Sequence, residues 1–362
     1  MSNSFMKLKD ETAIDLITLS SMGIRLTPLD RRSVHTGNLY EMRSTSAESN
    51  VLNVAASLGL NTKVLTKFVA DSPISALIKG ELRKRNIAFE GVSVPQGGPW
   101  GYRHQFNIAD AGFGARGPRV YNDRAGEVGL TLSADEFDLT RIFETDGARI
   151  LHLSGLVAAM SESTGKACLD IASKAKESGT VISFDMNYRA SFWTGRETEL
   201  REIFSEIASL ADILLGNEED FQLALGIRGP EAGGTNLSDK IDGFKGMIGR
   251  VSESYPNARI FATTLREVIS ANRHAWGALL CVDGTWFAEP LREIEIYDRI
   301  GGGDGFAAGL LYGVLKGYEP ESWLQLGWAS GALAAGSAED YASPADEEQL
   351  WGIYSGNARV KR

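Results

Sequence analysis

A glycine-rich turn near the C-terminus carries the residues best suited to chemistry. Three consecutive glycines, Gly301, Gly302 and Gly303, precede Asp304, and an apolar stretch of helical character follows directly. Amides at a helix N-terminus carry partial positive charge and, with no side chains around them, can hold a negatively charged group. A carboxylate beside them can accept a proton from an attacking hydroxyl. The turn therefore predicts phosphoryl transfer, with Asp304 as general base and the three glycine amides as an anion hole.

The chain that leads to this turn alternates between two patterns from residue 149 on. Short apolar runs cover 150–154, 181–185 and 213–216, and amphipathic stretches of helical length lie between them. Continuous apolar strands separated by helices are typical of a parallel sheet covered on both faces. Such sheets bind ligands beyond the carboxyl ends of their strands, so we expect an α/β fold with the site at that edge. The helices expected here cover 164–176, 197–210 and 218–225.

Polar residues are expected to end three strands of this sheet. They form the clusters 185–189, 217–220 and 263–267, the last directly after the apolar segment 259–262. Because the carboxyl ends of parallel strands meet at one edge of a sheet, the three clusters should lie close together. They are the first candidates for residues that bind a substrate.

The C-terminal third predicts a hairpin and two helices. The pair Asp283-Gly284 between apolar stretches at 276–282 and 285–288 indicates a type I′ turn. After the glycine-rich turn, helices are expected over 305–316 and 320–337.

The first third has a different character. A first strand is expected over 16–25, and the region from about 97 to 127 combines glycines with aromatic and basic residues in short alternating stretches. Alternation of this kind is typical of β structure. We therefore expect a β-rich lid over the active edge of the sheet.

The composition is that of a globular protein and limits the classes of partner. The chain has 362 residues, 43% hydrophobic and 23% charged, with a formal net charge of −10. A nucleic-acid-binding surface needs clustered Lys and Arg, and the negative balance argues against one. No apolar run approaches the ~18 residues of a membrane span, and the N-terminus lacks the apolar core of a signal peptide. We expect a cytoplasmic protein that binds small molecules, and neither nucleic acid nor membrane.

The cysteines and histidines do not suggest a metal centre. Cys168 and Cys281 lie far apart in apolar segments, which indicates buried free thiols. The four histidines show no spacing such as His-x-x-x-His, so we expect structural roles for them.

Four ordered segments together resemble a known family. The run from Asp298 to Gly309 resembles the C-terminal signature of the ribokinase-like (PfkB-type) sugar kinases, and 185–189, 216–220 and 264–267 are similar to segments of 2-keto-3-deoxygluconate kinases. The resemblance implies a Rossmann-like ribokinase fold with a mostly parallel sheet flanked by helices and a small β-rich lid. It also implies ATP and Mg²⁺ as cosubstrate and cofactor, and transfer of the γ-phosphate to a sugar-acid hydroxyl, giving 2-keto-3-deoxygluconate 6-phosphate.

The resemblance also implies the organisation of the chain. Residues 1–362 would form a single carbohydrate-kinase domain, with lid segments at about 33–49 and 97–127 inserted in the α/β core. Lid strands in this family often pair between subunits, so a homo-oligomer through the lid is expected.

Residues on both sides of the reaction acquire roles from the resemblance. Arg189 and Arg124 would face the carboxylate and phosphate, since a planar guanidinium suits both anions, although an isolated arginine is more often a surface ion-pair partner. Asn217 and Asp220 would hold Mg²⁺ through water, and Asn217 would also cap the following helix. The implied substrate-binding residues are Asn50, Tyr102, Tyr121, Arg124, Arg189, Asp304 and Asp340. The implied ATP-binding residues are Asn217, Thr264, Arg266, Gly277, Gly301 and Gly303.

Two positions depart from the family pattern. Thr45-Ser46 stands where the family has a Gly-Gly pair shortly before Asn50, and Ser20-Ser21 stands where it usually has Gly-Glu. Glycine permits close approach and unusual dihedral angles, so the replacement of Gly-Gly is expected to stiffen or crowd the hinge of the lid.

Three alternatives remain beside a sugar-acid kinase. The altered N-terminal contacts would suit a sugar or nucleotide sensor without catalytic activity on the same fold, or a related kinase for another sugar such as fructose. A nicotinamide-dependent oxidoreductase is disfavoured, because residues 16–23 contain no Gly-x-Gly-x-x-Gly after the first strand.

Overall fold

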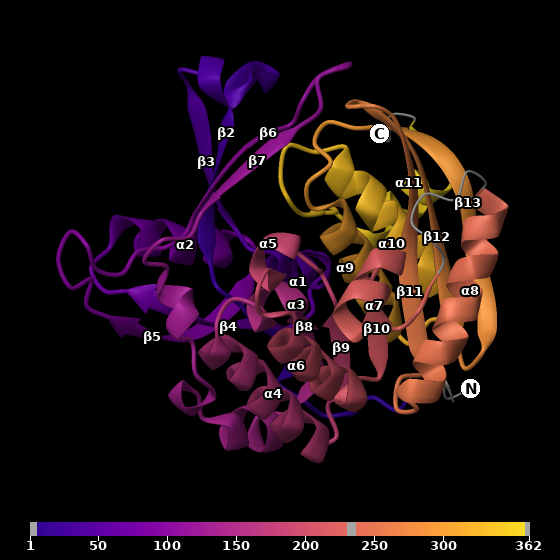
Figure 1. The fold of residues 1–362 in the computed structure, drawn as a ribbon, viewed down its shortest axis with the longest axis horizontal. Helices are drawn as coiled ribbons and strands as arrows, with labels where there is room; N and C mark the ends of the chain where they lie inside the picture. The colour runs from indigo at the N-terminus through magenta and orange to yellow at the C-terminus, as the bar shows by residue number, and fades with distance from the viewer. Residues whose placement is uncertain (1–5, 230–236, 359–362) are drawn as a thin grey trace.

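The protein is described by a computed structural model, which covers residues 6–229 and 237–358. Its main element is a sheet of nine strands in the order β13-β12-β11-β10-β9-β8-β1-β4-β5 (Figure 1). Seven neighbouring strands, β5 to β11 in that order, pair in parallel, and β12 and β13 add an antiparallel hairpin at one side. The strands are β1 Ile14–Leu19, β4 Thr62–Val69, β5 Ile87–Val94, β8 Ala148–Ser154, β9 Val181–Asp185, β10 Ile213–Leu215, β11 Ile260–Ser270, β12 Arg273–Val282 and β13 Thr285–Glu295.

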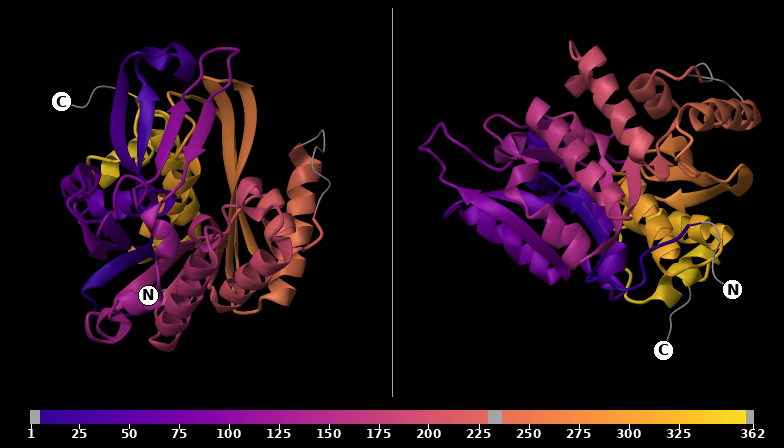
Figure 2. Two further views of the ribbon diagram at one scale, coloured as in Figure 1. Left: turned by 60° about the vertical axis from the view of Figure 1, so that its left-hand side comes forward. Right: turned by 90° about the horizontal axis from the view of Figure 1, so that it is seen from below.

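Helices cover both faces of this sheet, which confirms the predicted α/β fold with a mostly parallel sheet (Figure 2). Successive strand residues point to opposite faces, so Leu151 belongs to one hydrophobic core and Ile150 to the other. The first core packs against α4 Glu162–Glu177, α6 Glu197–Leu210, α7 Glu218–Leu225 and α8 Leu237–Ser254. The second packs against α1 Ala47–Ser57, α2 Pro73–Lys84, α9 Gly302–Leu315, α10 Pro320–Ala335 and α11 Glu347–Tyr354. Two short helices are α3 Gly155–Ala158 and α5 Ala190–Trp193.

A second sheet of four strands projects beyond the edge of the core (Figures 1 and 2). Its order is β3-β2-β6-β7, with β2 and β6 parallel and the other pairs antiparallel. Its strands are β2 Gly23–Pro28, β3 Tyr40–Thr45, β6 Phe106–Asp110 and β7 Arg119–Asp123. We call this four-stranded sheet the lid.

The predicted first strand over 16–25 is wrong, because the chain forms two strands there. β1 ends at Leu19 and β2 begins at Gly23, and the two belong to different sheets. Both segments are apolar and extended, and nothing local in the sequence marks the point at which the chain leaves the core sheet. The connection places Ser20 and Ser21 at the base of the lid.

The expected end of a strand before Thr263 is also wrong. β11 continues to Ser270, so Thr264 and Arg266 lie within the strand and pair with Ala278 and Trp276 of β12. By contrast, the hairpin between β12 and β13 turns at Asp283 and Gly284, both with positive φ (48° and 79°), as the predicted type I′ turn requires.

Two further findings concern the cysteines and the hydropathy of the helices. Cys168 and Cys281 are both free and buried, as expected. Within the described ranges, no helix combines the length and hydropathy that crossing a membrane requires.

Candidate active site

The lid, the core sheet and the glycine-rich turn enclose a cavity of about 860 Å³. Lid residues such as Val120 and Asn122 form one wall, and the start of α1 around Asn50 forms another. The carboxyl ends of β9 and β10, at Asp185 and Leu215, complete the side formed by the core sheet. The cavity therefore lies at the edge of the sheet where ligands of α/β proteins bind.

The glycine-rich turn enters the cavity at the beginning of α9. Gly301 precedes the first helical residue with φ 84°, a left-handed conformation, and a Cβ placed there would lie 1.8 Å from the carbonyl oxygen of Asp340. Gly303 lines the cavity, and a Cβ on it would meet open space. Gly302 does not line the cavity; it is buried, and a Cβ on it would contact Trp276. Two of the three predicted anion-hole glycines therefore border the cavity.

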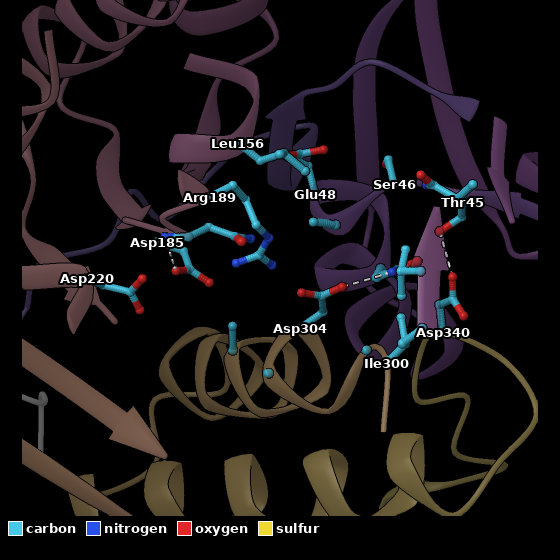
Figure 3. A pocket seen from close by; sticks show the side chains of 18 of the residues that line it. Thr45, Ser46, Glu48, Leu156, Asp185, Arg189, Asp220, Ile300, Asp304 and Asp340 are labelled. Carbon is cyan, nitrogen blue, oxygen red and sulfur yellow. Dashed lines mark hydrogen bonds between the residues drawn. The ribbon is translucent and has the colours of Figure 1, made fainter. Parts of the chain in front are cut away.

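Asp304, in the first turn of α9, points its carboxylate into the cavity (Figure 3). The side-chain amide of Asn50 donates to its Oδ2 at 2.9 Å, and Arg189 lies on its other side. Burial raises the pKa of the Asp304 carboxyl to about 7; Glu48 adds to this increase, and the amide of Asn50 opposes it. A pKa near neutrality is what a general base for a hydroxyl group needs.

Turnover should rise with pH through about 7, because Asp304 must lose its proton before it can accept one from a substrate. The dependence of kcat/KM on pH between about 5.5 and 9 reports this ionisation in the free enzyme. In Asn50→Ala the hydrogen bond that lowers the pKa of Asp304 is lost, so the rising limb should move to higher pH. A profile that is flat over this range would contradict the assignment.

The two predicted arginines reach the cavity from different sheets. Arg189 follows β9 and donates to the carbonyl oxygen of Tyr188 at 2.9 Å. It forms no ion pair with another described residue. Arg124 follows lid strand β7, where its Nη1 binds both carboxylate oxygens of Glu127, at 2.8 and 2.9 Å. Both line the cavity. An anion in the cavity could therefore contact Arg189 without displacing a carboxylate, whereas Arg124 already has one.

Three predicted binding residues do not line the cavity. Tyr121 is 50% exposed; its neighbours Val120 and Asn122 face the cavity, and successive residues of a strand point to opposite faces. Tyr102 is 40% exposed and also lies outside the lining. Gly277 lies within the hairpin, where a Cβ would be 2.8 Å from the carbonyl oxygen of Glu289. The structure thus does not bring these three residues to the site.

The predicted metal residues serve first as a helix cap. The Asn217 side chain accepts from the amides of Glu219 and Asp220, and the carboxylate of Asp220 accepts from the amides of Asn217 and Tyr188. Both line the cavity. Among the described residues, no group of three or more His, Cys, Asp or Glu is placed to hold a metal ion directly. Contact through water, as predicted, fits this geometry, because Mg²⁺ usually keeps several waters and binds substrate phosphates.

Asp185 is a site residue that the sequence names only as a member of the polar cluster 185–189, without a role of its own. It ends β9 beside Asp220, and its side chain points into the cavity toward Arg189 (Figure 3). Burial, with the nearby carboxylates of Asp220 and Asp304, raises the pKa of Asp185 to about 8. A cation near Asp185 and Asp220 would relieve this repulsion, so the two acids fit contact through water with a phosphate-bound Mg²⁺. The signal in the sequence was its position as the last residue of an apolar strand.

Two arginines give part of the cavity wall a positive charge. Thr264 and Arg266 of β11 line the cavity, as predicted for ATP-binding residues, together with Arg299 of the glycine-rich turn. Arg266 keeps an exposed surface, but partial desolvation of its guanidinium lowers its pKa, and the charge of Arg299 lowers the pKa further. The pKa of His274 falls to about 4, by burial and then by the charges of the same two arginines. Two neighbouring guanidinium groups favour a polyanion such as a triphosphate.

The two departures near the lid base are accommodated by hydrogen bonds. Ser46 is extended (φ −164°, ψ 146°) and caps α1, so its backbone conformation does not require glycine. Thr45 Oγ1 donates to Oδ2 of Asp340 at 2.7 Å (Figure 3). Ser20 Oγ donates to the buried carboxylate of Glu48 at 2.7 Å, and Ser21 Oγ donates to Glu127. The side chains that stand in place of the family residues therefore connect the lid base to the cavity wall.

Comparisons with known proteins agree over almost the whole chain. The model of the pfkB family carbohydrate kinases matches residues 13–347. A 2-dehydro-3-deoxygalactonokinase of Haloferax volcanii is 26% identical over 348 residues, covering 96% of this chain and 99% of the relative. A 2-dehydro-3-deoxygluconokinase of Thermoproteus tenax is 24% identical over 344 residues, covering 94% and 95%.

Solved structures show the same similarity in three dimensions. The 2-dehydro-3-deoxygluconokinase of Thermotoga maritima aligns with a TM-score of 0.84 at 27% identity, covering 95% of this chain and 98% of that one. A putative ribokinase II of E. coli in complex with ATP and Mg²⁺ aligns with a TM-score of 0.73 at 16% identity, covering 95% and 99%. The second likeness is one of fold.

Proposed function

Because the chain belongs to the pfkB family of carbohydrate kinases, we propose that it transfers the γ-phosphate of ATP to a hydroxyl of 2-keto-3-deoxygluconate, also called 2-dehydro-3-deoxygluconate. Family membership confirms the resemblance drawn from the sequence and leaves no support for a nicotinamide-dependent oxidoreductase. The observation that carries the proposal is the position of Asp304: a carboxylate in the cavity, in the first turn of α9, with Arg189 beside it. Several relatives are named as sugar-acid kinases, which supports the substrate class.

The reaction follows from this arrangement. Asp304 accepts the proton of the substrate hydroxyl as the oxygen attacks the terminal phosphorus, and the bond from this phosphorus to the bridging oxygen breaks with ADP as the leaving group. The amides of Gly301 and Gly303 stabilise the negative charge of the transferring phosphoryl group. Arg266 and Arg299 bind the nucleotide phosphates, and Asp185, Asn217 and Asp220 are the residues that would hold Mg²⁺ through water. When bound, Mg²⁺ neutralises phosphate charge during the transfer.

The sugar acid binds on the lid side of Asp304. Asn50 and Arg124 reach this part of the cavity from α1 and β7, and Arg189 reaches it from the core sheet. Arg189 binds the substrate carboxylate, because its guanidinium has no ion-pair partner among the described residues. A site built to hold a carboxylate discriminates against a neutral sugar, since an arginine left without its partner costs binding free energy.

A coupled assay of ADP release with ATP and Mg²⁺ tests the proposal. The substrates compared are 2-keto-3-deoxygluconate, 2-dehydro-3-deoxygalactonate, 5-dehydro-2-deoxygluconate and fructose. We expect kcat/KM to be highest for 2-keto-3-deoxygluconate and lower for fructose by roughly 10²-fold or more. Equal use of fructose would overturn the choice of a sugar acid. Saturable sugar binding without ADP release would instead identify a sensor.

Arg189→Gln provides the control for substrate class in this assay. The variant should raise KM for the sugar acid and change KM for fructose little, because only the acid offers Arg189 a carboxylate. Loss of the positive charge near Asp304 should lower kcat for both substrates alike.

A homo-oligomer through the lid stays a prediction.

A further inference from the structure

Arg25, on lid strand β2, is buried between two carboxylates from distant parts of the chain. Its Nη2 binds Oδ2 of Asp298 and its Nη1 binds Oδ1 of Asp340. Arg25 is 2% exposed, Asp298 1% and Asp340 6%, so this group of three charges is largely buried, and Arg25 and Asp340 border the cavity. The second oxygen of Asp340 accepts from Thr45 of β3. Through one guanidinium, lid strand β2 thus binds the segment before α9, at Asp298, and the segment after α10, at Asp340.

Both carboxylates also shape the glycine-rich turn. Oδ1 of Asp298 accepts from the amide of Ile300 at 3.0 Å, which fixes the first residues of the turn. The backbone carbonyl of Asp340 packs against Gly301, where even a Cβ would lie within 1.8 Å. The positions of these two acids therefore determine where the amides at Gly301 and Gly303 and the carboxylate of Asp304 stand in the cavity.

A second contact joins the same segments. Arg43 of β3 donates to the carbonyl oxygen of Ala338, two residues before Asp340. At the far end of the lid, Arg31 donates to the carbonyl oxygen of Ile296 at 2.8 Å, two residues before Asp298. Arg25 differs from both, because it binds side-chain carboxylates and bridges the two segments.

Removing the guanidinium would leave two carboxylates buried together. Burial raises the pKa of Asp298, the charge of Arg25 opposes this shift, and Asp340 adds to it. Without Arg25, one acid must take up a proton or the two must move apart, and either change displaces the turn between them. Transition-state stabilisation depends on the position of the turn to within a fraction of an ångström.

The geometry points to Arg25 as a positioning residue for phosphoryl transfer, which holds the glycine-rich turn in its active conformation through Asp298 and Asp340. Both terminal nitrogens of its guanidinium bind these two acids, so it acts through them. The inference rests on the proposed function and adds to it a residue with no assigned role in the reaction. Because Arg25 lies on the lid, the same bridge makes the position of the anion hole depend on the docking of the lid base.

Two variants at position 25 test this role. Arg25→Lys keeps one positive charge but cannot bind both carboxylates with a planar fork, and Arg25→Met removes the charge and keeps much of the volume. We expect both to lower kcat, Arg25→Met by about 10²-fold, with smaller changes in KM for the sugar acid and ATP. A third variant, Arg25→Ala, removes the side chain, and guanidinium at millimolar concentration should partly restore its kcat. The matched control is Arg149→Met, which breaks a partly buried Arg–Asp pair outside the cavity and should leave kcat unchanged.

A second measurement does not depend on the sugar. Binding of MgADP with tetrafluoroaluminate imitates the transferring phosphoryl group, so the Arg25 variants should weaken the fluoroaluminate complex while MgADP alone binds as in the wild type. If the wild type forms this complex but phosphorylates no sugar acid, the proposed function fails and the role of Arg25 is still tested. Wild-type kcat in folded variants, equal losses of MgADP and fluoroaluminate binding, or failure of both variants to fold by circular dichroism would overturn the inference.

Discussion

Asp304→Asn is expected to lower turnover by about 10²- to 10⁴-fold while the protein keeps its fold and its affinity for ATP. Asparagine has nearly the same shape as aspartate, and its side-chain oxygen can still accept the hydrogen bond that Asn50 donates at 2.9 Å. A neutral amide is also easier to bury than a carboxylate. What it cannot do is accept the proton of the attacking hydroxyl.

Steady-state kinetics with ATP and the sugar acid gives kcat, and isothermal titration calorimetry gives the affinity for ATP. A suitable control is Asp346→Asn: Asp346 caps α11 by accepting from the amide of Gln349 at 2.8 Å, and it does not line the cavity. Both variants replace an aspartate at the start of a helix, but only Asp304→Asn removes the proposed general base, so a difference in kcat between them reports the loss of that base. Wild-type turnover in Asp304→Asn would refute its role as general base.

Gly301→Ala should be nearly as damaging, for a steric reason. A Cβ at Gly301 would lie 1.8 Å from the carbonyl oxygen of Asp340, and φ at this position is 84°. The turn must shift to relieve the contact, which moves the anion-hole amides, and loss of one such donor costs about 10²- to 10³-fold in kcat. We also expect a lower melting temperature, because the left-handed conformation alone costs a residue with a side chain about 1–2 kcal/mol.

Gly59→Ala separates these two effects. Gly59 has almost the same dihedral angle, φ 85°, but a Cβ there meets no atom within 4 Å, and it lies outside the cavity. The control should therefore show the loss of stability and normal kcat, measured by thermal unfolding and by the coupled assay. If Gly301→Ala behaved in the same way, the close approach of Asp340 would have no catalytic consequence.

The sequence was most informative where local patterns and tertiary structure agree. The predicted helices over 197–210 and 218–225 match α6 and α7, because each has an apolar face that packs on the sheet. For α7 the start was also marked, since Asn217 and Asp220 form a capping box. The α/β class could thus be predicted from periodicity and caps, and the ribokinase fold from the resemblance.

Prediction failed where pairing at a distance decides the structure. Beyond Thr264, β11 runs past the helices that cover the sheet, so Arg266 and Glu267 are exposed, and its hydrogen bonds come from β12. A polar, exposed strand has no apolar pattern by which to recognise it. Tyr121 was placed in the site by resemblance, but the register of β7 turns its side chain away.

Much of the candidate cavity was nevertheless named in advance, because the resemblance supplied strand-end and turn residues. Asn50, Arg124, Arg189 and Asp304 all line it, and their roles stay predictions. Arg25 could not be found in this way: its partners Asp298 and Asp340 are 273 and 315 residues away in the chain. Nothing near Arg25 in the sequence indicates that its charge is buried.

The spread of these residues along the chain has a consequence for biosynthesis. The cavity wall runs from Ser21 and Arg25 to Asp340, so a nascent polypeptide cannot complete it until residue 340 has left the ribosome. Nucleotide and sugar stabilise only a chain that can bind them. Shortened products of interrupted translation would therefore gain no protection from either ligand, and the cell's proteases should remove them faster than the finished enzyme.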